Sequence, residues 1–290
     1  MYTNKFKIGF LGALLLSGLV GCSNDDAVDT TDSQDESGII SNAEMTLTYG
    51  SKLLSSYVSL KNSTINFENF SNNDQSQAAI NALNAVKTYT PDLVGAIPLT
   101  GSQWHNINSG GTYYIPENTT FTGGITFNGA ATLIIIGNLG GSNWLTIPNG
   151  GVVNVAPSGK ILSTVNIGFN STSTFNNYAT TTLNSTPNGI INNYADLTFT
   201  AGSVDGTINN YKEVFFTHTG DISLNSSSLV NNHCKMEFNS KVNINVTLNN
   251  DSYMNFKTGF HINSSGNLVL APGSLTDVTG GSITVDGKIK

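Results

Sequence analysis

Two acidic side chains in the C-terminal half of the chain have a spacing that could support catalysis. Asp196 and Glu213 occupy equivalent positions in neighbouring copies of a sequence repeat. Two carboxyl groups about 5 Å apart are what a retaining glycosidase needs. The same pair, with Lys235 at the next equivalent position, is also typical of a solvated surface row with charge compensation. Asp196 and Glu213 are therefore the catalytic candidates, and the surface row is the alternative.

A series of rings occupies a second equivalent position of the repeat. It consists of Tyr178, Tyr194, Tyr211 and His233, and Asp251 follows at the same position. If the copies stack, the rings form a column along the molecule. Sugars bind aromatic rings through their apolar C–H sides, and tyrosine adds a hydroxyl group. The series therefore predicts a ligand-binding surface for glycans; the alternative is that the rings only stack on one another.

A further aromatic group lies earlier in the chain. It consists of Trp104, Tyr113, Tyr114 and Trp144. We expect these side chains to cover the end of the core beneath the N-terminal segment. The alternative is a second surface for a ligand.

The sequence contains no motif for a metal, a cofactor or a known catalytic mechanism. The four histidines lack the paired spacing of zinc sites, and the calcium-binding nonapeptide is missing. There is no Gly-x-Ser-x-Gly elbow, phosphate loop or dinucleotide fingerprint. All basic residues other than histidine are lysines, and arginine is better suited to holding the carboxylates of acidic polysaccharides. We therefore expect no metal and no cofactor, and we favour a non-catalytic role over an enzyme.

The elements that position these residues are predicted by the repeat itself. Each copy has an apolar residue at offset 0, asparagines at offsets 1 and 2, and apolar residues at offsets 6 and 8. The offsets stay fixed while the distance between copies varies. The copies begin at Ile191, Ile208, Val230 and Leu248, with a degraded copy at Ile262 and an incomplete one at Phe175.

This pattern predicts an all-β fold, a single-stranded parallel β-helix over residues 101–290. Offsets 6 and 8 lie on one face of a strand, and a coil of about 20 residues must stack on its neighbours to bury that face. Stacked asparagines can form a ladder of amide hydrogen bonds. Asparagine also tolerates the left-handed backbone of a tight corner. We therefore place the Asn-Asn pairs at corners, and we expect a right-handed coil. The architecture resembles that of pectate lyases, without a recognisable enzyme motif.

The first 21 residues form a targeting segment. Lys5 and Lys7 precede an apolar stretch that is too short to span a bilayer. It ends at Leu19-Val20-Gly21-Cys22, which resembles the signal of bacterial lipoproteins. The resemblance implies that Cys22 is lipidated and becomes the mature N-terminus. The alternative is an ordinary secretory signal.

Residues 22–43 are expected to be a disordered acidic tether. They contain six acids and no base. The sequence Ser23-Asn24-Asp25-Asp26 resembles the surface-export signal of Bacteroidetes lipoproteins, which implies an outer-membrane protein facing the cell exterior. A basic face for nucleic acid is absent from the chain.

Residues 44–100 are expected to form an N-terminal cap with a helix at about 75–89. Asp74 and Gln77 resemble a capping box, an apolar helical face follows, and Pro91 ends it. The cap would seal the open end of the β-helix; the alternative is a helix that binds a partner.

The sequence as a whole therefore predicts a lipid-anchored surface protein that binds glycans or another surface protein. The alternatives are a polysaccharide hydrolase or lyase and a structural component of the cell surface. An ice-binding solenoid is disfavoured because threonine does not recur at one offset in consecutive coils.

Overall fold

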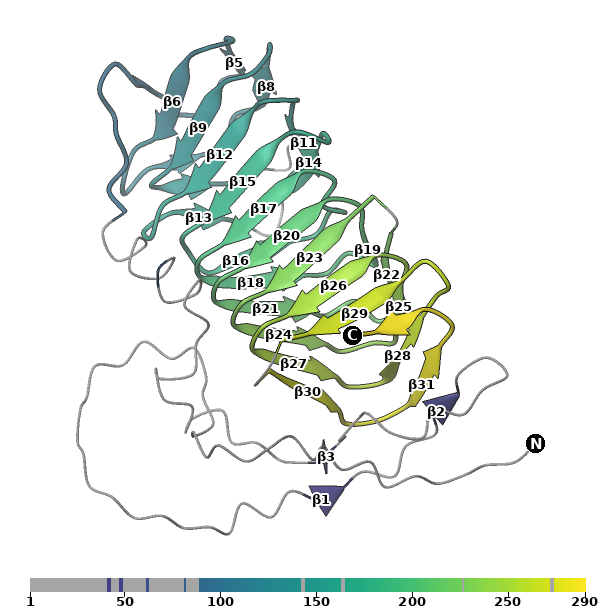
Figure 1. Ribbon diagram of the computed structural model, residues 1–290. Coiled ribbons are helices and arrows are strands. Elements are labelled where there is room, and N and C mark those ends of the chain that lie inside the picture. The colour runs from purple at the N-terminus through teal and green to yellow at the C-terminus, as the bar shows by residue number, and fades with distance from the viewer. Residues whose placement is uncertain are drawn as a thin grey trace, which may run out of the picture.

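The described part of the chain winds into a parallel β-solenoid (Figure 1). The computed structural model describes residues 89–141, 144–162, 165–225, 227–271 and 274–290, together with Asn81 and residues 41–42, 47–48 and 61–62. Between residues 89 and 290 the described residues contain strands and no helix. The targeting segment, the tether and the cap helix lie outside the described residues, apart from isolated positions. Handedness of the coil stays a prediction.

One long sheet of eleven strands runs along the whole solenoid (Figure 1). Its neighbouring strands are parallel throughout. Its strands, in spatial order, are β4 (Ile97–Pro98), β6 (Thr112–Ile115), β9 (Thr132–Ile135), β12 (Val152–Val155), β15 (Thr174–Asn177), β17 (Ile190–Asn193), β20 (Thr207–Asn210), β23 (Leu229–Asn232), β26 (Thr247–Asn250), β29 (Asn267–Leu270) and β32 (Lys288–Ile289).

Two shorter sheets complete the coils in the C-terminal half. The second sheet consists of β16 (Thr181–Leu183), β18 (Asp196–Phe199), β21 (Glu213–Phe216), β24 (Lys235–Phe238), β27 (Tyr253–Phe256) and β30 (Leu275–Val278). The third sheet consists of β19 (Ser203–Val204), β22 (Ile222–Leu224), β25 (Val242–Ile244), β28 (Gly259–Ile262), β31 (Ser282–Val285) and β2 (Leu47–Thr48).

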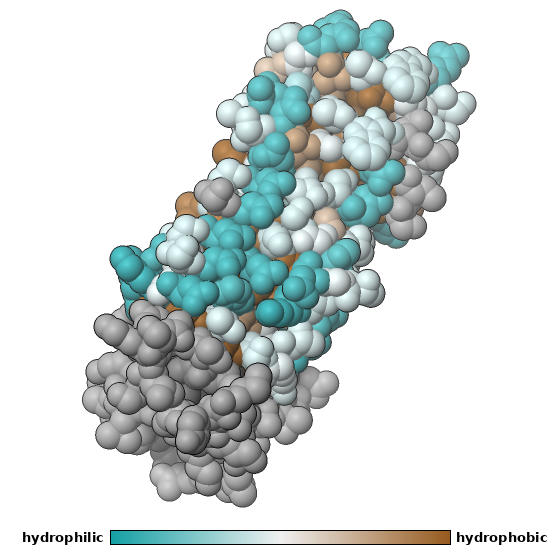
Figure 2. Space-filling view, turned by 90° about the vertical axis from the view of Figure 1, so that its right-hand side faces the viewer, coloured by the Kyte–Doolittle hydropathy of each residue, from teal (hydrophilic) through white to brown (hydrophobic). Residues whose placement is uncertain are grey.

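Shorter strands close the first coils. One side carries β7 (Thr120–Phe121), β10 (Asn138–Leu139) and β13 (Lys160–Ile161), and another carries the pairs β5 (His105–Ile107) with β8 (Ile125–Phe127) and β11 (Trp144–Ile147) with β14 (Asn166–Phe169). A separate antiparallel pair joins β1 (Ser41–Asn42) and β3 (Lys61–Asn62). Figure 2 shows the side formed by β5, β8, β11, β14 and the third sheet, which is mostly hydrophilic towards the C-terminal end.

The core of the C-terminal half contains the residues predicted from offsets 6 and 8. Because side chains alternate between the two faces of a strand, both positions point inward. Equivalent residues of successive coils therefore stack on one another. The offset-8 rings of Phe199, Phe216, Phe238 and Phe256 stack with centroids 5.0, 4.6 and 5.0 Å apart. All four are at most 1% exposed, which shows that the apolar column is fully buried. The repeat was therefore interpreted correctly as a stacked β-solenoid.

The placement of the Asn-Asn pairs at the corners was wrong. Each pair forms the last two residues of a strand in the long sheet, as in β17 (Ile190–Asn193). The corner is the two residues that follow, such as Tyr194 and Ala195 before β18 begins at Asp196. Among the described residues, Asn118 is the only residue other than glycine with positive φ. The pairs are thus explained by side-chain hydrogen bonding along the strands, not by a left-handed backbone.

Candidate functional site

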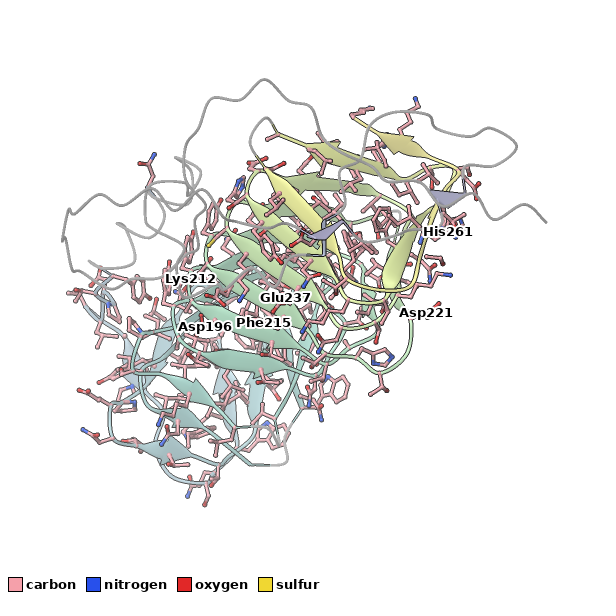
Figure 3. All side chains as sticks on the ribbon, turned by 90° about the horizontal axis from the view of Figure 1, so that it is seen from below. Asp196, Lys212, Phe215, Asp221, Glu237 and His261 are labelled. Atoms are coloured by element: carbon pink, nitrogen blue, oxygen red, sulfur yellow. The ribbon has the colours of Figure 1, made fainter. Side chains whose placement is uncertain are left out.

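The acid row lies on the outer face of the second sheet, as the repeat predicted, and Figure 3 labels its first member, Asp196. Asp196 pairs in register with Glu213, and Glu213 pairs with Lys235. The Lys235 ammonium lies 3.2 Å from one Glu213 carboxylate oxygen and 3.9 Å from a Glu237 oxygen. The same ammonium lies 4.9 Å from the centroid of the Phe215 ring. Since Lys235 engages the Glu213 carboxylate, this geometry matches the charge-compensated row, which was the alternative to catalysis.

The predicted ring column is present at the corner between the long sheet and the second sheet. Successive ring centroids of Tyr178, Tyr194, Tyr211 and His233 lie 4.9, 5.1 and 5.1 Å apart, with interplanar angles of 4°, 7° and 14°. His233 Nδ1 lies 2.7 Å from Asp251 Oδ2, which ends the column. The structure therefore brings together all four residues that the sequence singled out for ligand binding.

Tyr89 extends this column at its N-terminal end, which the repeat did not predict. Its ring stacks on that of Tyr178 with centroids 3.9 Å apart. Tyr89 belongs to the expected cap and lies outside the repeat, so no constant offset could reveal it. We call the five rings from Tyr89 to His233 the corner column.

The stacking decides how the corner column can meet a ligand. Each inner ring has a neighbouring ring on both faces, so its faces are not open to a sugar. The tyrosines are half-buried, and no hydrogen bond within the described residues uses the hydroxyls of Tyr178, Tyr194 or Tyr211. Contact with a ligand is thus limited to ring edges and hydroxyl groups, and the expected C–H stacking does not fit the inner rings.

The phenol groups of Tyr89, Tyr178 and Tyr194 have raised pKa values. Burial raises the pKa of Tyr194 to about 12, with further contributions from the neighbouring Tyr178 and Tyr211. Burial also raises the pKa of Tyr178, and that of Tyr89. Near neutral pH the hydroxyls of these three tyrosines therefore offer both a donor and an acceptor without charge.

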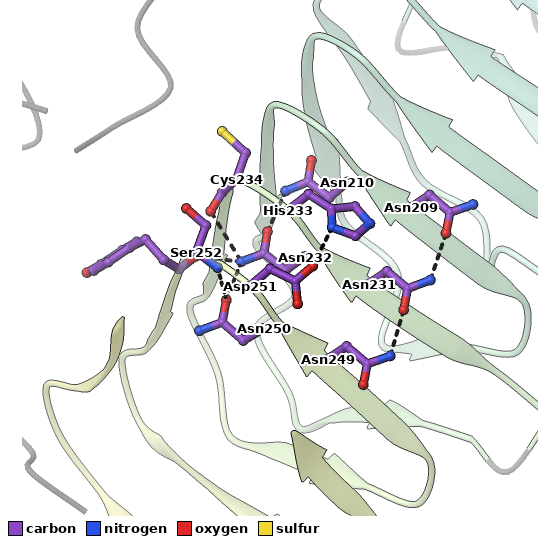
Figure 4. Close-up of polar contacts among 11 residues, drawn as sticks. Asn209, Asn210, Asn231, Asn232, His233, Cys234, Asn249, Asn250, Asp251 and Ser252 are labelled. Carbon is purple, nitrogen blue, oxygen red and sulfur yellow. Dashed lines mark hydrogen bonds and ion pairs between the residues drawn. The ribbon is translucent and has the colours of Figure 1, made fainter. Parts of the chain in front are cut away.

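A ladder of side-chain amides runs along the long sheet beside the corner column (Figure 4). Each asparagine at offset 1 donates from Nδ2 to Oδ1 of the equivalent residue one coil nearer the N-terminus. The Nδ2–Oδ1 distances are 2.7 to 2.9 Å. We call this the outer ladder, and its members are Asn154, Asn176, Asn192, Asn209, Asn231 and Asn249.

The outer ladder leaves part of its hydrogen-bonding capacity unused. An amide has two N–H donors and two acceptor lone pairs. Among the described residues, an inner member such as Asn209 donates one N–H to Asn192 Oδ1, and its own Oδ1 accepts one N–H from Asn231. These residues are half-buried, so the remaining N–H and lone pair are accessible at the surface. The ladder therefore repeats one donor and one acceptor at every coil.

A second ladder lies inside the corner and runs in the opposite direction. The asparagines at offset 2 are 0% exposed, and each donates to Oδ1 of the equivalent residue one coil nearer the C-terminus. Asn210, for example, also donates to the carbonyl of Lys235 and accepts from the amide of Lys212. These bonds satisfy the backbone of the two-residue corner. We call this the inner ladder, and its members are Asn177, Asn193, Asn210, Asn232 and Asn250.

The tryptophans expected beneath the N-terminal segment are instead exposed. Trp104 is 65% and Trp144 is 63% exposed, whereas Tyr113 is 6% exposed and belongs to the core. The N-terminal helix that was expected to lie over this group is outside the described residues, so its role as a cover stays a prediction.

A buried polar cluster lies at the far end of the second sheet. The Tyr253 hydroxyl donates to Asp277 Oδ2 at 3.1 Å, and Asp277 is 1% exposed. Within the described residues the other oxygen, Oδ1, has no hydrogen-bond partner. Strand β3 contacts β30, which carries Asp277. Burial raises the pKa of Asp277 from 3.8 to about 6, although the Tyr253 hydrogen bond opposes this shift.

This raised pKa predicts a pH-dependent stability. In the unfolded chain Asp277 ionises near pH 3.8, and in the folded chain it ionises only near 6. The carboxyl group therefore favours unfolding increasingly as the pH rises from about 4 to about 6, and the loss is complete above that window. We expect Asp277→Asn to raise the melting temperature at pH 7 and to remove the fall in melting temperature between pH 4 and pH 6. Tyr253→Phe should extend this fall to higher pH. The same dependence of melting temperature on pH in the wild type and both variants would contradict the assignment.

The described residues contain neither a cluster of metal ligands nor a membrane-spanning helix. No group of three or more His, Cys, Asp or Glu side chains among them could hold a metal ion. None of the helical residues that the structure describes belongs to a helix long and apolar enough to cross a membrane. The chain matches no protein-family model, no curated protein and no solved structure.

Proposed function

We propose that this protein is a cell-surface lipoprotein whose solenoid binds glycans without catalysis. The observation that supports this best is the surface formed by the corner column and the outer ladder. Tyrosine hydroxyls and amide groups run side by side along the solenoid, each repeating once per coil. We call this surface the corner ridge.

The corner ridge suits a long, uncharged and hydroxylated ligand. Its side chains from Tyr89 to Tyr211 and along the outer ladder carry no charge. Neutral donors and acceptors match the hydroxyl groups of a polysaccharide. Because the pattern repeats at the coil spacing of about 4.8 Å, a polymer lying along the axis would meet similar groups at every coil. The free energies of many weak contacts then add up along the polysaccharide, as in multivalent binding.

The hydroxyl groups of the column provide the test of this proposal. We expect Tyr194→Phe/Tyr211→Phe to weaken binding to a neutral polysaccharide about tenfold, since two ligand hydrogen bonds of about 0.7 kcal/mol each are lost. The rings remain stacked in this variant, so its melting temperature should stay within about 2 °C of the wild type. Binding would be measured on a panel of soluble and insoluble polysaccharides.

A matched control separates the ridge from a general effect of losing hydroxyls. Tyr114→Phe removes a half-buried hydroxyl from the same sheet, two coils beyond the last member of the outer ladder at its N-terminal end, and should leave binding unchanged. Tyr194→Ala/Tyr211→Ala should abolish binding at the ridge but also disturb the stack. Full binding by the Phe double variant would exclude the corner ridge as the site, and binding to no glycan would exclude the function.

The membrane anchor is the second part of the proposal. The sequence Leu19-Val20-Gly21-Cys22 and the acidic residues after it support a Bacteroidetes-type lipoprotein on the outer surface of the cell. Cys22 lies outside the described residues. In the native host, we expect the N-terminal peptide to carry a lipid on Cys22. Cys22→Ser should release the protein from the membrane fraction, and protease added to intact cells should degrade the anchored form.

The cysteine content makes this test decisive. The chain has two cysteines, and the second, Cys234, is 1% exposed. A Cys22 sulfur that carries a lipid as a thioether cannot also form a disulfide. The mass of the Cys22 peptide before and after reduction distinguishes the two chemistries. A peptide released only by reduction would exclude lipidation.

A further inference from the structure

The only two tryptophans of the chain are among the most exposed apolar side chains of the residues that the structure describes. Trp104 is 65% and Trp144 is 63% exposed. An indole ring has a large apolar surface, and exposing one in water is unfavourable unless something else covers it. Both lie at the N-terminal end of the solenoid, away from the corner ridge.

The two tryptophans occupy the same position of the solenoid, two coils apart. Trp104 immediately precedes β5, which pairs with β8 at a register of His105 with Ile125, so Gly124 is its counterpart in the next coil. The long sheet advances by 20 residues at each of these coils, from Thr112 to Thr132 and on to Val152. Adding 20 twice to 104 gives 144, and β8 contacts β11, which begins at Trp144. The two indoles are therefore roughly 10 Å apart along the axis, twice the strand spacing.

Each indole rests on a glycine of the following coil. A Cβ atom on Gly124 would lie 2.1 Å from Cε3 of Trp104, so the ring lies directly against this glycine. The Trp104 Nε1–H donates to Thr126 Oγ1 at 3.0 Å, which fixes the orientation of the ring. A Cβ atom on Gly168 would lie 3.0 Å from Nε1 of Trp144. One side of each indole is thus supported by backbone, and the rest faces solvent.

The surroundings of the indoles are polar but uncharged. Strands β5, β8, β11 and β14 contain no Asp, Glu, Lys or Arg. Their outward positions next to the indoles carry Asn106, Thr126, Thr146 and Asn166. Figure 2 shows this side, and its upper part combines weakly hydrophilic groups with small apolar areas. A charged ligand would find no counter-ion here, whereas a neutral one with hydroxyl groups would find donors and acceptors.

We propose that Trp104 and Trp144 form a second binding site, at which a neutral polysaccharide chain stacks two of its sugar rings on the two indoles. Unlike the rings of the corner column, these indoles are not stacked on any other ring of the described residues, and they can accept the apolar C–H side of a sugar. Gly124 lies between the two tryptophans, and because it has no side chain the Trp104 indole can lie flat over it. The inference rests on the ligand class of the proposed function but not on the corner ridge.

Tryptophan fluorescence of the full chain tests this site directly. Since Trp104 and Trp144 are the only tryptophans, all indole emission reports on this surface. The free protein should emit as a water-exposed indole and be quenched by acrylamide. Titration with neutral polymers (hydroxyethylcellulose, xylan and galactomannan) should shift the emission of at least one of them to shorter wavelength and protect it from acrylamide. Polygalacturonate, an acidic polymer, should have little effect.

The variants define what would overturn the proposal. Trp104→Ala and Trp144→Ala should each weaken binding about tenfold or more, because each removes one stacking contact. Gly124→Ala should also weaken binding, since the added methyl group displaces the Trp104 ring. Leu229→Ala, at a residue 38% exposed on the long sheet, is the control for loss of apolar surface. Unchanged emission with every neutral polymer, or unchanged affinity in both tryptophan variants, would exclude the site.

The outcomes also separate this inference from the proposed function. The corner ridge alone would be supported if the wild type binds without any change in tryptophan emission and Tyr194→Phe/Tyr211→Phe loses this binding. Binding lost only in the tryptophan variants would support the second site alone. Absence of binding to any polymer in a direct binding assay would exclude both.

Discussion

Replacing Phe216 by alanine is expected to lower the free energy of unfolding by about 3–5 kcal/mol. The ring is 1% exposed and lies between those of Phe199 and Phe238, at 5.0 and 4.6 Å. Deleting it leaves a cavity in the middle of a stack, and the coils above and below cannot approach because the strand spacing is fixed by backbone hydrogen bonds. Chemical denaturation followed by circular dichroism measures the loss.

Phe215→Ala is the matched control for this prediction. It makes the same chemical change at the adjacent residue, whose side chain points to the outer face of the second sheet and is half-buried beside Lys235. We expect the free energy of unfolding to fall by roughly 1 kcal/mol, because one cation–π contact and a partly buried ring are removed. Similar losses at both positions would show that the alternation of inner and outer faces assigned to β21 is wrong.

Replacing Asn210 in the inner ladder by alanine is expected to cost about 3 kcal/mol or more. Its side chain is 0% exposed, donates to Asn232 Oδ1 and to the Lys235 carbonyl, and accepts from Asn193. Alanine leaves these buried groups without partners, and each such group costs about 1–3 kcal/mol. Asn210→Asp should be at least as costly, because it keeps the shape but places a carboxylate against two acceptor oxygens. Denaturation curves of both variants provide the measurement.

The outer ladder provides the control at the neighbouring residue. Asn209→Ala removes two amide hydrogen bonds of the same kind, but at a half-buried position where water replaces them. The expected loss is about 1 kcal/mol. If Asn209→Ala proved as costly as Asn210→Ala, burial would not be what distinguishes the two ladders.

The sequence by itself determined the stacking of the coils and the composition of the core. Constant offsets were sufficient because a solenoid places equivalent residues of successive coils in contact. The offset-8 phenylalanines, the corner rings and the register of Asp196 with Glu213 follow from this rule. Amide hydrogen bonding between stacked asparagines was predicted for the same reason.

The tertiary structure decided which faces of the side chains are accessible and how the residues outside the repeat are packed. Strand alternation points the two asparagines of each pair to opposite sides, which makes two ladders of opposite direction instead of one corner. The tilt of each ring decides whether its faces are available, and a repeat carries no information about tilt. Tyr89 and the exposed tryptophans lie outside the regular copies, so their environment depends on how unlike segments pack. Sequence periodicity specifies contacts between equivalent residues, whereas accessibility depends on the three-dimensional surroundings of each side chain.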